Sequence, residues 1–522
     1  MQKEHKILKI LIIVLISAFP IAMKAQQSGT KRSIDISSRL ELFVDNYLIE
    51  NLTGKAKLQL HHPEKKEIVM VHNEPWEGSG SGYHSIFKDG NKYRMYYKAW
   101  QHEASGDLSN QHPLYCAYAE SNDGINWTKP NLGLYEFNGS KDNNIVFISG
   151  KTGNFNLNAG HPAVFKDENP NVPADALYKA ILIGKESTTS NFGLIAFKSP
   201  DGIHWSLISD KPIITDGAFD SQNLVFWDNF RNEYRAYWRY FSKENKGNLY
   251  VGNRGIRTAT SQDFIHWNEQ ANLEYVDSPE EQLYTNQIKP YFRAPHLFIG
   301  FPARYVDRGW STSMKALPEL EEREKRASKS ERYGTALTES LFMVSRDGKI
   351  FKRWNEAFLR PGLERNGTWT YGDGYIGWHI VETPSDIDGA PSEMSLYSTE
   401  NYWKGKSSKL RRYTLRLDGF VSVNAPMSGG ELITKPLTFS GSKLMLNFSS
   451  SAAGGIQVEV QDATTGKVFP GFGIEDCPVI FGDTIERVVN WKNGNNVSAL
   501  EGKSLRLRFV LKDADLFSFQ FK

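Results

Sequence analysis

Short apolar runs that alternate with polar residues recur along most of this chain, and they predict β-strands. Runs such as 115–119, 193–198 and 341–344 are too short for helices, and Gly, Asn, Asp and Ser, the residues that form turns, follow them. Residues 317–329, rich in Glu, Lys and Arg, have instead the composition of a helix, which we expect to lie on the surface. The pattern therefore predicts an all-β fold with one helical insertion.

A turn motif of the form Ser-x-Asp-Gly-x-x-Trp follows the strand-like runs and is repeated. Its copies lie at 121–127, 199–205, 261–267 and, in a longer version, 345–354, and residues 398–403 are a degenerate fifth copy. Asp-Gly makes a tight hairpin turn, and the Trp can cover the next strand. Copies about 60–85 residues apart leave room for four short strands each, which predicts a five-bladed β-propeller.

The composition changes near residues 424–430, which predicts a second domain. We expect residues 26–423 to form the five-bladed β-propeller and residues 424–522 to form a small C-terminal β-sandwich. The sandwich either packs as a structural cap or binds carbohydrate. A strand over residues 40–49 is expected to close the ring by joining the last blade.

The first 25 residues have the features of a secretory signal peptide. Lys3, Lys6 and Lys9 precede an apolar run over 10–22, and Ala25 is a small residue at a plausible cleavage site. We expect residues 1–25 to be removed and the protein to be exported, either to the periplasm or out of the cell. No integral membrane segment is expected after this cleavage.

Charge and cysteine content narrow the partners that we expect. A net charge of +2 over 522 residues gives no reason to expect nucleic acid as a partner. Cys116 and Cys477 are too few for a disulfide scaffold. No His-x-x-x-His spacing that is typical of a zinc site occurs, so neither a metal nor another cofactor is expected.

The succession of strand, Asp-Gly turn, strand and Ser-x-Asp-Gly-x-x-Trp resembles the five-bladed propeller glycoside hydrolases of the fructosidase and arabinanase clans, over residues 40–423. The resemblance implies a funnel-shaped active site at the ring axis, lined by the first strand of each blade. In that family an Asp begins the first inner strand, another Asp lies in the second blade and a Glu acid in the third. Here His84 and His161 stand at the first two positions, so only the location of the site carries over.

Glycoside hydrolysis needs two carboxyl groups, so carboxylates near the inner strands are the first catalytic candidates. Asp220 and Glu281 precede the inner strands of the third and fourth blades, although each can also serve as a turn or loop carboxylate. Asp45 interrupts an apolar run and is either catalytic or an inter-blade hydrogen-bond acceptor. His84 and His161 occupy equivalent positions in consecutive blades, where each is either an acid–base group or a core histidine.

Sugar sites combine aromatic platforms with polar groups, and basic residues there suit a uronate or a sulfated sugar. Salt bridges between blades explain the basic residues equally well, and a turn explains the aspartate in 371–375. The candidate substrate-binding residues are Tyr83, Gln222, Asn223, Tyr284, Lys289, Arg293, Arg304, Trp369, Tyr371, Asp373 and His379.

Together these features predict an exported carbohydrate-active enzyme that degrades oligosaccharides derived from a polysaccharide. Glycoside hydrolysis by Asp220 and Glu281 is the first hypothesis. A dehydratase or lyase that abstracts the proton beside a uronate carboxylate is the second. The residues assigned to that second reaction are His84, His161, Tyr284 and Arg293. A non-catalytic sugar-binding propeller is the third.

Overall fold

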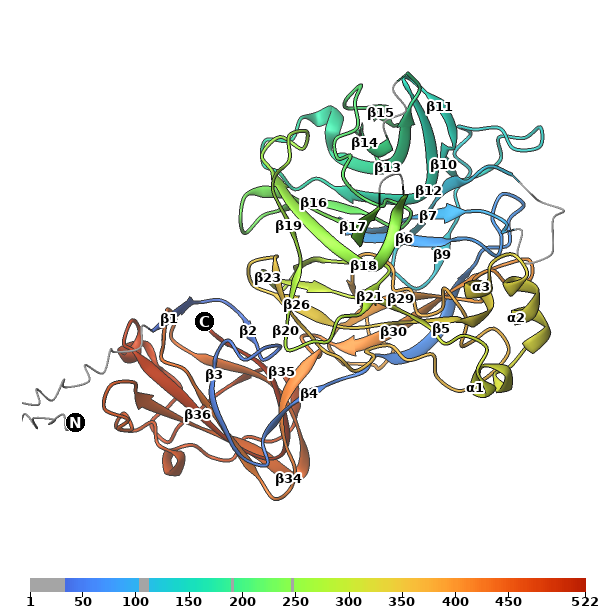
Figure 1. Cartoon of the computed structure of the whole chain (residues 1–522). Helices are drawn as coiled ribbons and strands as arrows, with labels where there is room; N and C mark the ends of the chain where they lie inside the picture. The colour runs from blue at the N-terminus through green and yellow to red at the C-terminus, as the bar shows by residue number, and fades with distance from the viewer. Residues whose placement is uncertain (1–32, 103–111, 189–191, 246–247) are drawn as a thin grey trace, which may run out of the picture.

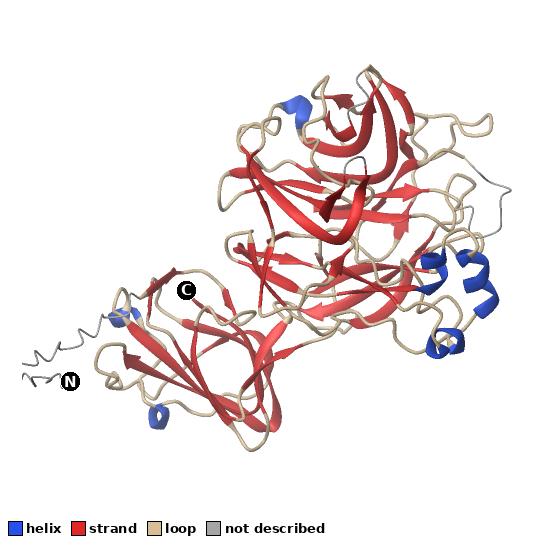
Figure 2. Cartoon of the chain, in the orientation of Figure 1, coloured by secondary structure: helices blue, strands red, loops and turns tan. Residues whose placement is uncertain are grey.

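The computed structural model of the chain describes residues 33–102, 112–188, 192–245 and 248–522. These residues form two units, a larger one of several sheets and a smaller one that contains the C-terminus (Figure 1). Almost all of the regular structure is strand (Figure 2), so the prediction of an all-β chain is confirmed. Residues 1–25, the predicted signal peptide, lie outside the described residues.

Five successive sheets make up the larger unit. Sheet one contains β6 (Gly82–Asp89), β7 (Lys92–Ala99), β8 (Tyr115–Ser121), β9 (Trp127–Thr128) and β10 (Ile145–Ile148). Sheet two contains β11 (Gly150–Thr152), β12 (Phe155–Lys166), β13 (Tyr178–Glu186), β14 (Phe192–Ser199) and β15 (Ser206–Leu207). Sheet three contains β16 (Leu224–Asp228), β17 (Glu233–Asn245), β18 (Asn248–Ser261) and β19 (Asn268–Asn272).

Sheets four and five complete the series. Sheet four contains β20 (Glu274–Val276), β22 (Lys289–Tyr291), β23 (Ala294–Gly300), β26 (Met343–Ser345) and β27 (Ile350–Arg353). A three-stranded side sheet accompanies it, made of β21 (Gln282–Leu283), β24 (Ala303–Asp307) and β25 (Ala336–Ser340). Sheet five contains β28 (Val381–Thr383), β29 (Glu393–Glu400), β30 (Lys409–Arg416) and β5 (Glu64–Val71).

The repeated motif builds turns that join neighbouring sheets. In its first copy the Ser121 hydroxyl accepts a hydrogen bond from the Gly124 amide at 2.9 Å. Gly124 has a φ of 75°, in the left-handed region that glycine adopts without strain. Its carbonyl accepts a hydrogen bond from Tyr397 of sheet five at 2.6 Å, just as Gly202 of sheet two accepts one from Tyr96 of sheet one at 2.9 Å. Phe165 of sheet two packs with Phe264 of sheet three, Tyr237 of sheet three donates to the Gly348 carbonyl of sheet four, and Tyr291 of sheet four contacts Met394 of sheet five. Because each sheet thus contacts the next and sheet five contacts sheet one, the five sheets form a ring.

A strand from the N-terminal part of the chain completes sheet five. β5 pairs antiparallel with one edge of β30, and β29 pairs with the other edge of β30. The segment 40–49, which was expected to close the ring, pairs elsewhere. β2 (Glu41–Leu42) pairs with β36 (Leu505–Phe521), and β3 (Ile49–Gly54) pairs with β32 (Gly430–Thr434). The ring is therefore closed by residues 64–71.

The smaller unit is one ten-stranded sheet that combines the two ends of the described chain. Besides β2, β3, β32 and β36, it contains β1 (Ile34–Ser37), β4 (Lys57–Leu60), β31 (Val421–Ala425), β33 (Leu437–Phe439), β34 (Leu444–Asp462) and β35 (Asp483–Val488). The long strand β36 pairs with five others. Phe43 from the N-terminal segment packs with Phe509 and Phe519 of β36 in one hydrophobic core. Residues 34–60 thus fold with the C-terminal segment.

Three short α-helices lie in the insertion of sheet four: α1 (Thr312–Ala316), α2 (Leu320–Ala327) and α3 (Glu331–Thr335). The helix α2 matches the predicted charged segment, but it is only partly exposed. Arg323 and Arg326 are 3% and 2% exposed, and Arg326 donates a hydrogen bond to the Tyr402 carbonyl at 3.1 Å. Within the described residues, no helix is both long enough and apolar enough to span a membrane.

Candidate active site

A cluster of buried tyrosines lies near the start of the inner strands at one end of the ring. We call it the tyrosine cluster, and its members are Tyr83, Tyr284, Tyr371, Tyr375 and Tyr402. The Tyr375 ring centroid lies 6.0 Å from that of Tyr83, 5.6 Å from that of Tyr284 and 6.1 Å from that of Tyr402. Tyr371 donates a hydrogen bond to the Tyr284 hydroxyl at 2.9 Å. Tyr83 has a φ of 52°, a strained conformation of the kind that gathers at functional sites.

Asp220 lies beside the tyrosine cluster, in the loop before β16. Its side chain is 58% exposed, and its two oxygens lie 3.6 Å from His161 Nε2 and 3.8 Å from Arg239 Nη2. The His161 ring packs against Tyr83 with centroids 4.8 Å apart, and the Arg239 guanidinium lies 5.0 Å over the Tyr284 ring. The structure therefore brings together five of the predicted residues, and Arg239 adds a cation to them. The five are Asp220, His161, Tyr83, Tyr284 and Tyr371.

Lys98 of β7 adds a second cation to the tyrosine cluster. Its side chain is 3% exposed, its Nζ donates a hydrogen bond to the Tyr402 hydroxyl at 2.7 Å, and it lies 4.8 Å over the Tyr83 ring. Burial lowers the pKa of Lys98 to about 7, against the opposing attraction of the Asp220 carboxylate. Burial also lowers the pKa of His161 to about 3, so this imidazole is neutral near pH 7.

The phenols of Tyr83 and Tyr402 keep their protons at neutral pH. Burial, together with the neighbouring phenols, raises the pKa of Tyr83 and of Tyr402 well above the ordinary value. The site therefore offers a neutral imidazole, an ammonium that titrates near neutrality, protonated phenols and an exposed carboxylate. This combination suits the transfer of protons to and from a bound molecule.

Glu281, the predicted partner of Asp220, is engaged in a different set of contacts. Its two oxygens lie 2.8 Å from Arg304 Nη1 and 3.1 Å from Arg353 Nη2, and Arg304 also binds Glu339. No hydrogen bond or ion pair joins Glu281 to Asp220 among the described residues. The structure thus places Glu281 and Arg304 in a network of ion pairs within sheet four and its side sheet.

Two further catalytic candidates are held away from the tyrosine cluster. The Asp45 carboxylate forms an ion pair with Arg346 at 2.9 Å, which links the N-terminal segment to the turn of sheet four. His84 is 1% exposed, and its Nε2 lies 3.1 Å from that of His72 within the core. His84 and His161 occupy matched positions in the sequence, but only the side chain of His161 contacts Asp220 among the described residues.

Gln222, predicted to bind substrate, instead closes the centre of the ring together with Gln287. The Gln222 Nε2 donates to the Pro162 carbonyl at 2.8 Å and to the Tyr83 carbonyl at 3.1 Å. Gln287 Nε2 donates to the Gln222 Oε1 at 2.8 Å and to the Ile376 carbonyl at 2.9 Å. The two amides connect all five sheets, and we call them the glutamine pair.

Other predicted binding residues have structural contacts. Asn223 donates to the Phe219 and Ser221 carbonyls at 2.9 and 2.8 Å, within its own loop. Arg293 forms an ion pair with Asp418 at 2.9 Å. Trp369 Nε1 donates to the Gly362 carbonyl at 2.8 Å. Asp373 is 5% exposed, and burial raises its pKa to about 7, so much of it is protonated at neutral pH.

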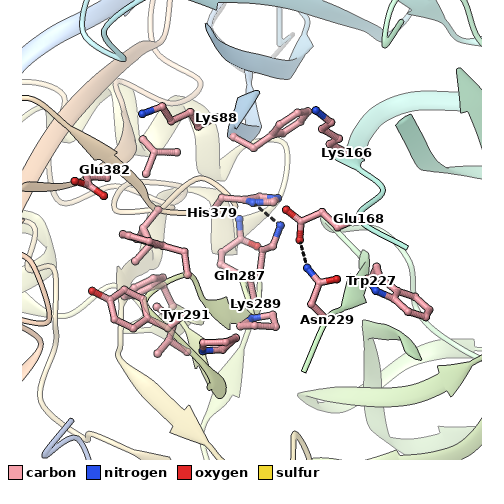
Figure 3. A pocket seen from close by; sticks show the side chains of 18 residues that line it. Lys88, Lys166, Glu168, Trp227, Asn229, Gln287, Lys289, Tyr291, His379 and Glu382 are labelled. Atoms are coloured by element: carbon pink, nitrogen blue, oxygen red, sulfur yellow. Dashed lines mark hydrogen bonds between the residues drawn. The ribbon is translucent and has the colours of Figure 1, made fainter. Parts of the chain in front are cut away.

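Lys289 and His379 lie at the other end of the ring axis. They line a cavity of about 470 Å³ (Figure 3). Lys88, near the end of β6, and Lys166, at the end of β12, also line it. Gln287 lines the same cavity. Because the glutamine pair lies between this cavity and Tyr83, the predicted binding residues are divided between two ends of the ring.

Sequence reasoning missed Lys98 and Arg239, and a signal for both was present. Each lies on the second strand of its sheet, directly after two aromatic residues, in Tyr-Tyr-Lys over 96–98 and Tyr-Trp-Arg over 237–239. A cation that is buried among the aromatic residues of a strand is seldom without a partner. The described residues contain no group of three or more His, Cys, Asp or Glu side chains placed to hold a metal ion.

No protein-family model matches the sequence, and no curated protein matches it either. Several solved structures are similar, at low identity. They include a Bombyx mori GH32 β-fructofuranosidase (9% identity, 89% of this chain and 94% of that chain, TM-score 0.38). They also include the catalytic domain of a Coprinopsis cinerea GH62 α-L-arabinofuranosidase (8% identity, 68% of this chain and 99% of that chain, TM-score 0.39). A third is an N-acetylgalactosamine deacetylase from F. plautii in complex with blood group B trisaccharide (10% identity, 70% of this chain and 96% of that chain, TM-score 0.41).

Proposed function

We propose that this chain is a carbohydrate-active enzyme whose active site is the tyrosine cluster with Asp220, and whose substrate is an acidic oligosaccharide. One observation carries the proposal: a single exposed carboxylate contacts His161 and Arg239, next to the buried ammonium of Lys98 and a set of phenols. Aromatic faces pack against sugar rings, while cations bind a uronate or a sulfate group. The tyrosine cluster supplies the aromatic faces, and Arg239 and Lys98 supply the cations.

Elimination is the reaction that these groups support best. The base takes the proton beside the uronate carboxylate, the freed electron pair forms a ring double bond, and the neighbouring C–O bond breaks with its electrons on oxygen. Asp220, the exposed carboxylate beside His161 and Arg239, is the base, and a phenol of the tyrosine cluster protonates the leaving oxygen. Arg239 and Lys98 offset the charge that grows on the carboxylate. A departing sugar makes the enzyme a lyase, and departing water makes it a dehydratase.

Hydrolysis of a glycosidic bond is the second candidate, and the exposure of Asp220 favours it. An aspartyl group that is 58% exposed beside aromatic rings can protonate a bound glycoside as the carboxylic acid or attack it as the carboxylate. The reaction needs a second carboxyl group, and the predicted one, Glu281, is bound by Arg304 and Arg353. Hydrolysis therefore requires either that Glu281 leaves these ion pairs or that another carboxyl group acts as the second one.

The proposal includes the architecture and location expected from the sequence. The five sheets are the blades of a five-bladed propeller, and residues 424–522, joined by residues 34–60, form an accessory β-sandwich. Residues 1–25 direct export, which would place the enzyme where extracellular polysaccharides are degraded. The ring contacts between Tyr397 and Gly124 and between Tyr96 and Gly202 support the circular arrangement.

Mass spectrometry of oligosaccharides incubated with the protein in ¹⁸O-labelled water tests the proposal. Neutral and uronate-containing oligosaccharides are compared, with D220N as the matched inactive control. Elimination predicts unlabelled products with an unsaturated ring, or the loss of one water, from the uronate-containing substrates alone. Label in a new reducing end would instead establish hydrolysis. Binding of every sugar without any product would leave a non-catalytic sugar-binding protein.

A further inference from the structure

The cavity at the other end of the ring axis has the size and lining of a ligand site. Its volume of about 470 Å³ falls in the range of small-molecule sites, roughly 300–1,000 Å³. Figure 3 shows Lys289, His379 and Gln287 together at its centre, with Glu168 and Asn229 opposite them. The glutamine pair separates these groups from the tyrosine cluster. Any ligand here is therefore distinct from a substrate bound at Asp220.

His379 presents an unmatched hydrogen-bond donor to this cavity. Lys289 Nζ lies 3.1 Å from His379 Nδ1, so the ammonium donates to that nitrogen and the ring proton resides on Nε2. The His379 side chain is only 8% exposed, and its Nε2 has no hydrogen-bond partner among the described residues. Burial and the adjacent Lys289 cation hold the pKa of His379 well below its ordinary value, which keeps the ring neutral. A buried N–H of this kind needs an acceptor.

Gln287 presents an unmatched acceptor to the same cavity. Its Nε2 donates to Gln222 Oε1 and to the Ile376 carbonyl, so both amide protons are used. Its Oε1 is buried and has no hydrogen-bond partner within the described part of the chain. A hydroxyl group on a ligand can donate to this oxygen. A ligand with an anionic acceptor and a hydroxyl donor would therefore complete the hydrogen bonds of both His379 and Gln287.

Lys289 is a cation of the lining that can meet an anion, although the carboxylates of Glu168 and Glu382 also line the cavity. Lys166 is paired with Asp89 at 2.6 Å, and Glu168 accepts a hydrogen bond from Asn229 at 2.6 Å. Lys289 forms no recorded ion pair with any carboxylate of the described residues, although Glu168 acts on it electrostatically from across the cavity. Its charge is therefore free to meet an anion. The titratable groups that line the cavity together with Lys289 are Lys88, Lys166, Glu168, Tyr291, His379 and Glu382.

The remaining walls are apolar and suit a compact carbon skeleton. They are formed by aromatic and aliphatic side chains, namely Phe87, Tyr291, Phe292, Ile299, Phe301 and Ile380. Apolar walls with a few placed polar groups are typical of sites that orient a small molecule. An inorganic anion would leave these walls unfilled. A polyhydroxylated acid of monosaccharide size matches both parts of the lining.

We propose that this cavity is a second, non-catalytic site that binds a small hydroxy acid of the size of a single uronic acid. The carboxylate accepts hydrogen bonds from Lys289 Nζ and His379 Nε2, and a ring hydroxyl donates to Gln287 Oε1. The proposal goes beyond the proposed function, because it requires neither elimination nor hydrolysis at Asp220. It also gives Lys289, which pairs with no carboxylate of the described residues, a role that the tyrosine cluster does not provide.

Isothermal titration calorimetry with D-glucuronate, and with D-glucose as the neutral analogue, tests the site. The wild-type chain should bind glucuronate with a Kd of about 1 mM or below and glucose at least tenfold more weakly. Lys289→Met should weaken glucuronate binding at least tenfold, and Lys289→Arg should retain most of it. The Arg variant keeps the buried charge, so it also covers the case in which the Met variant fails to fold.

Two matched controls separate this site from its alternatives. Lys88→Met removes an exposed cation at the mouth of the cavity and should change the Kd less than twofold. Asp220→Asn alters the tyrosine cluster and should leave intact the glucuronate binding that Lys289→Met removes. Loss of binding in Asp220→Asn with retention in Lys289→Met would assign the acid to the tyrosine cluster and overturn the proposal. Equal affinity for glucose, or no heat with glucuronate up to about 20 mM, would overturn it too.

Discussion

The two ends of the ring axis differ in which charged groups are in contact, although both hold buried polar atoms without a partner among the described residues, such as Tyr375 Oη and His379 Nε2. At the tyrosine cluster, the Asp220 carboxylate lies against His161 and Arg239, and Lys98 donates to Tyr402. In the cavity at the other end, Lys289 contacts His379 and forms no ion pair with a carboxylate of the described residues. A carboxylate held against an imidazole can exchange protons with a substrate, whereas a cation without a carboxylate partner can hold an anionic ligand. The comparison separates a place suited to chemistry from a place suited to binding.

Asp220→Asn should have the largest effect on this comparison. The substitution keeps the shape of the side chain and removes the charge beside His161 and Arg239. We expect kcat/KM to fall about 100- to 10,000-fold, in the range of a lost acid–base group. Steady-state kinetics on a uronate-containing oligosaccharide would measure it. Unchanged kinetics in a folded variant would remove the tyrosine cluster as the active site.

Lys98→Met should have the next largest effect, a loss of about 100-fold in kcat/KM. The pKa of Lys98 is lowered to about 7, so the free enzyme loses this cation as the pH rises through that value. If the ammonium binds the substrate carboxylate, kcat/KM of the wild type falls as the pH rises above 7. Lys98→Arg should keep the cation, recover part of the activity and lose this pH dependence. Identical pH profiles for the wild type and the Lys98→Arg variant would show that Lys98 is structural.

Gln222→Leu tests the boundary between the two ends. It leaves the Gln287 amide and the Pro162 and Tyr83 carbonyls without their buried partner. We expect a loss of roughly 2–3 kcal/mol in the free energy of unfolding, measured by denaturant titration. The exposed Gln270→Leu is the control and should change the stability by less than about 0.5 kcal/mol. Equal stability of the two variants would mean that the glutamine pair does not hold the sheets together.

Glu281→Gln should have the smallest effect on activity. Its ion pairs with Arg304 and Arg353 indicate a structural role, so we expect kcat/KM to stay within about threefold while stability falls by roughly 1–3 kcal/mol. Kinetics and thermal unfolding of the same preparation would separate the two effects. A loss of activity as large as that of Asp220→Asn, at unchanged stability, would restore the pair of carboxylates and favour hydrolysis.

The strand pattern and the turn motif were sufficient to predict the all-β fold, because both depend on local chemistry. The Gly124 turn is specified by a few adjacent residues, and its repetition follows from repeated contacts between sheets. The pairing of residues 34–60 with the C-terminal segment was not predictable in this way. Strand partners far apart in the chain leave no local signal, and 40–49 is equally apolar whichever sheet it joins.

The candidate site could be predicted in part for the same reason. Asp220 and Glu281 both precede a strand, so the sequence ranks them equally, and only the distant arginines Arg304 and Arg353 distinguish them. His84 and His161 are likewise matched in sequence. Backbone pairing is irregular beside both residues, between Gly82 and Ser85 in β6 and between Asn158 and Ala163 in β12, so the local pairing does not distinguish them either. Such details depend on packing and cannot be read from spacing.

Closure of the ring by β5 sets an order of events during synthesis. Arg411 donates a hydrogen bond to the Lys66 carbonyl across 345 residues of chain. At translation rates of about 5–20 residues per second, β5 waits roughly 17–70 s for its partner to be made. An unpaired strand edge is prone to aggregation, and charged residues suppress it. The charged first half of β5, Glu-Lys-Lys-Glu over 64–67, can thus protect the nascent chain until β30 is synthesised.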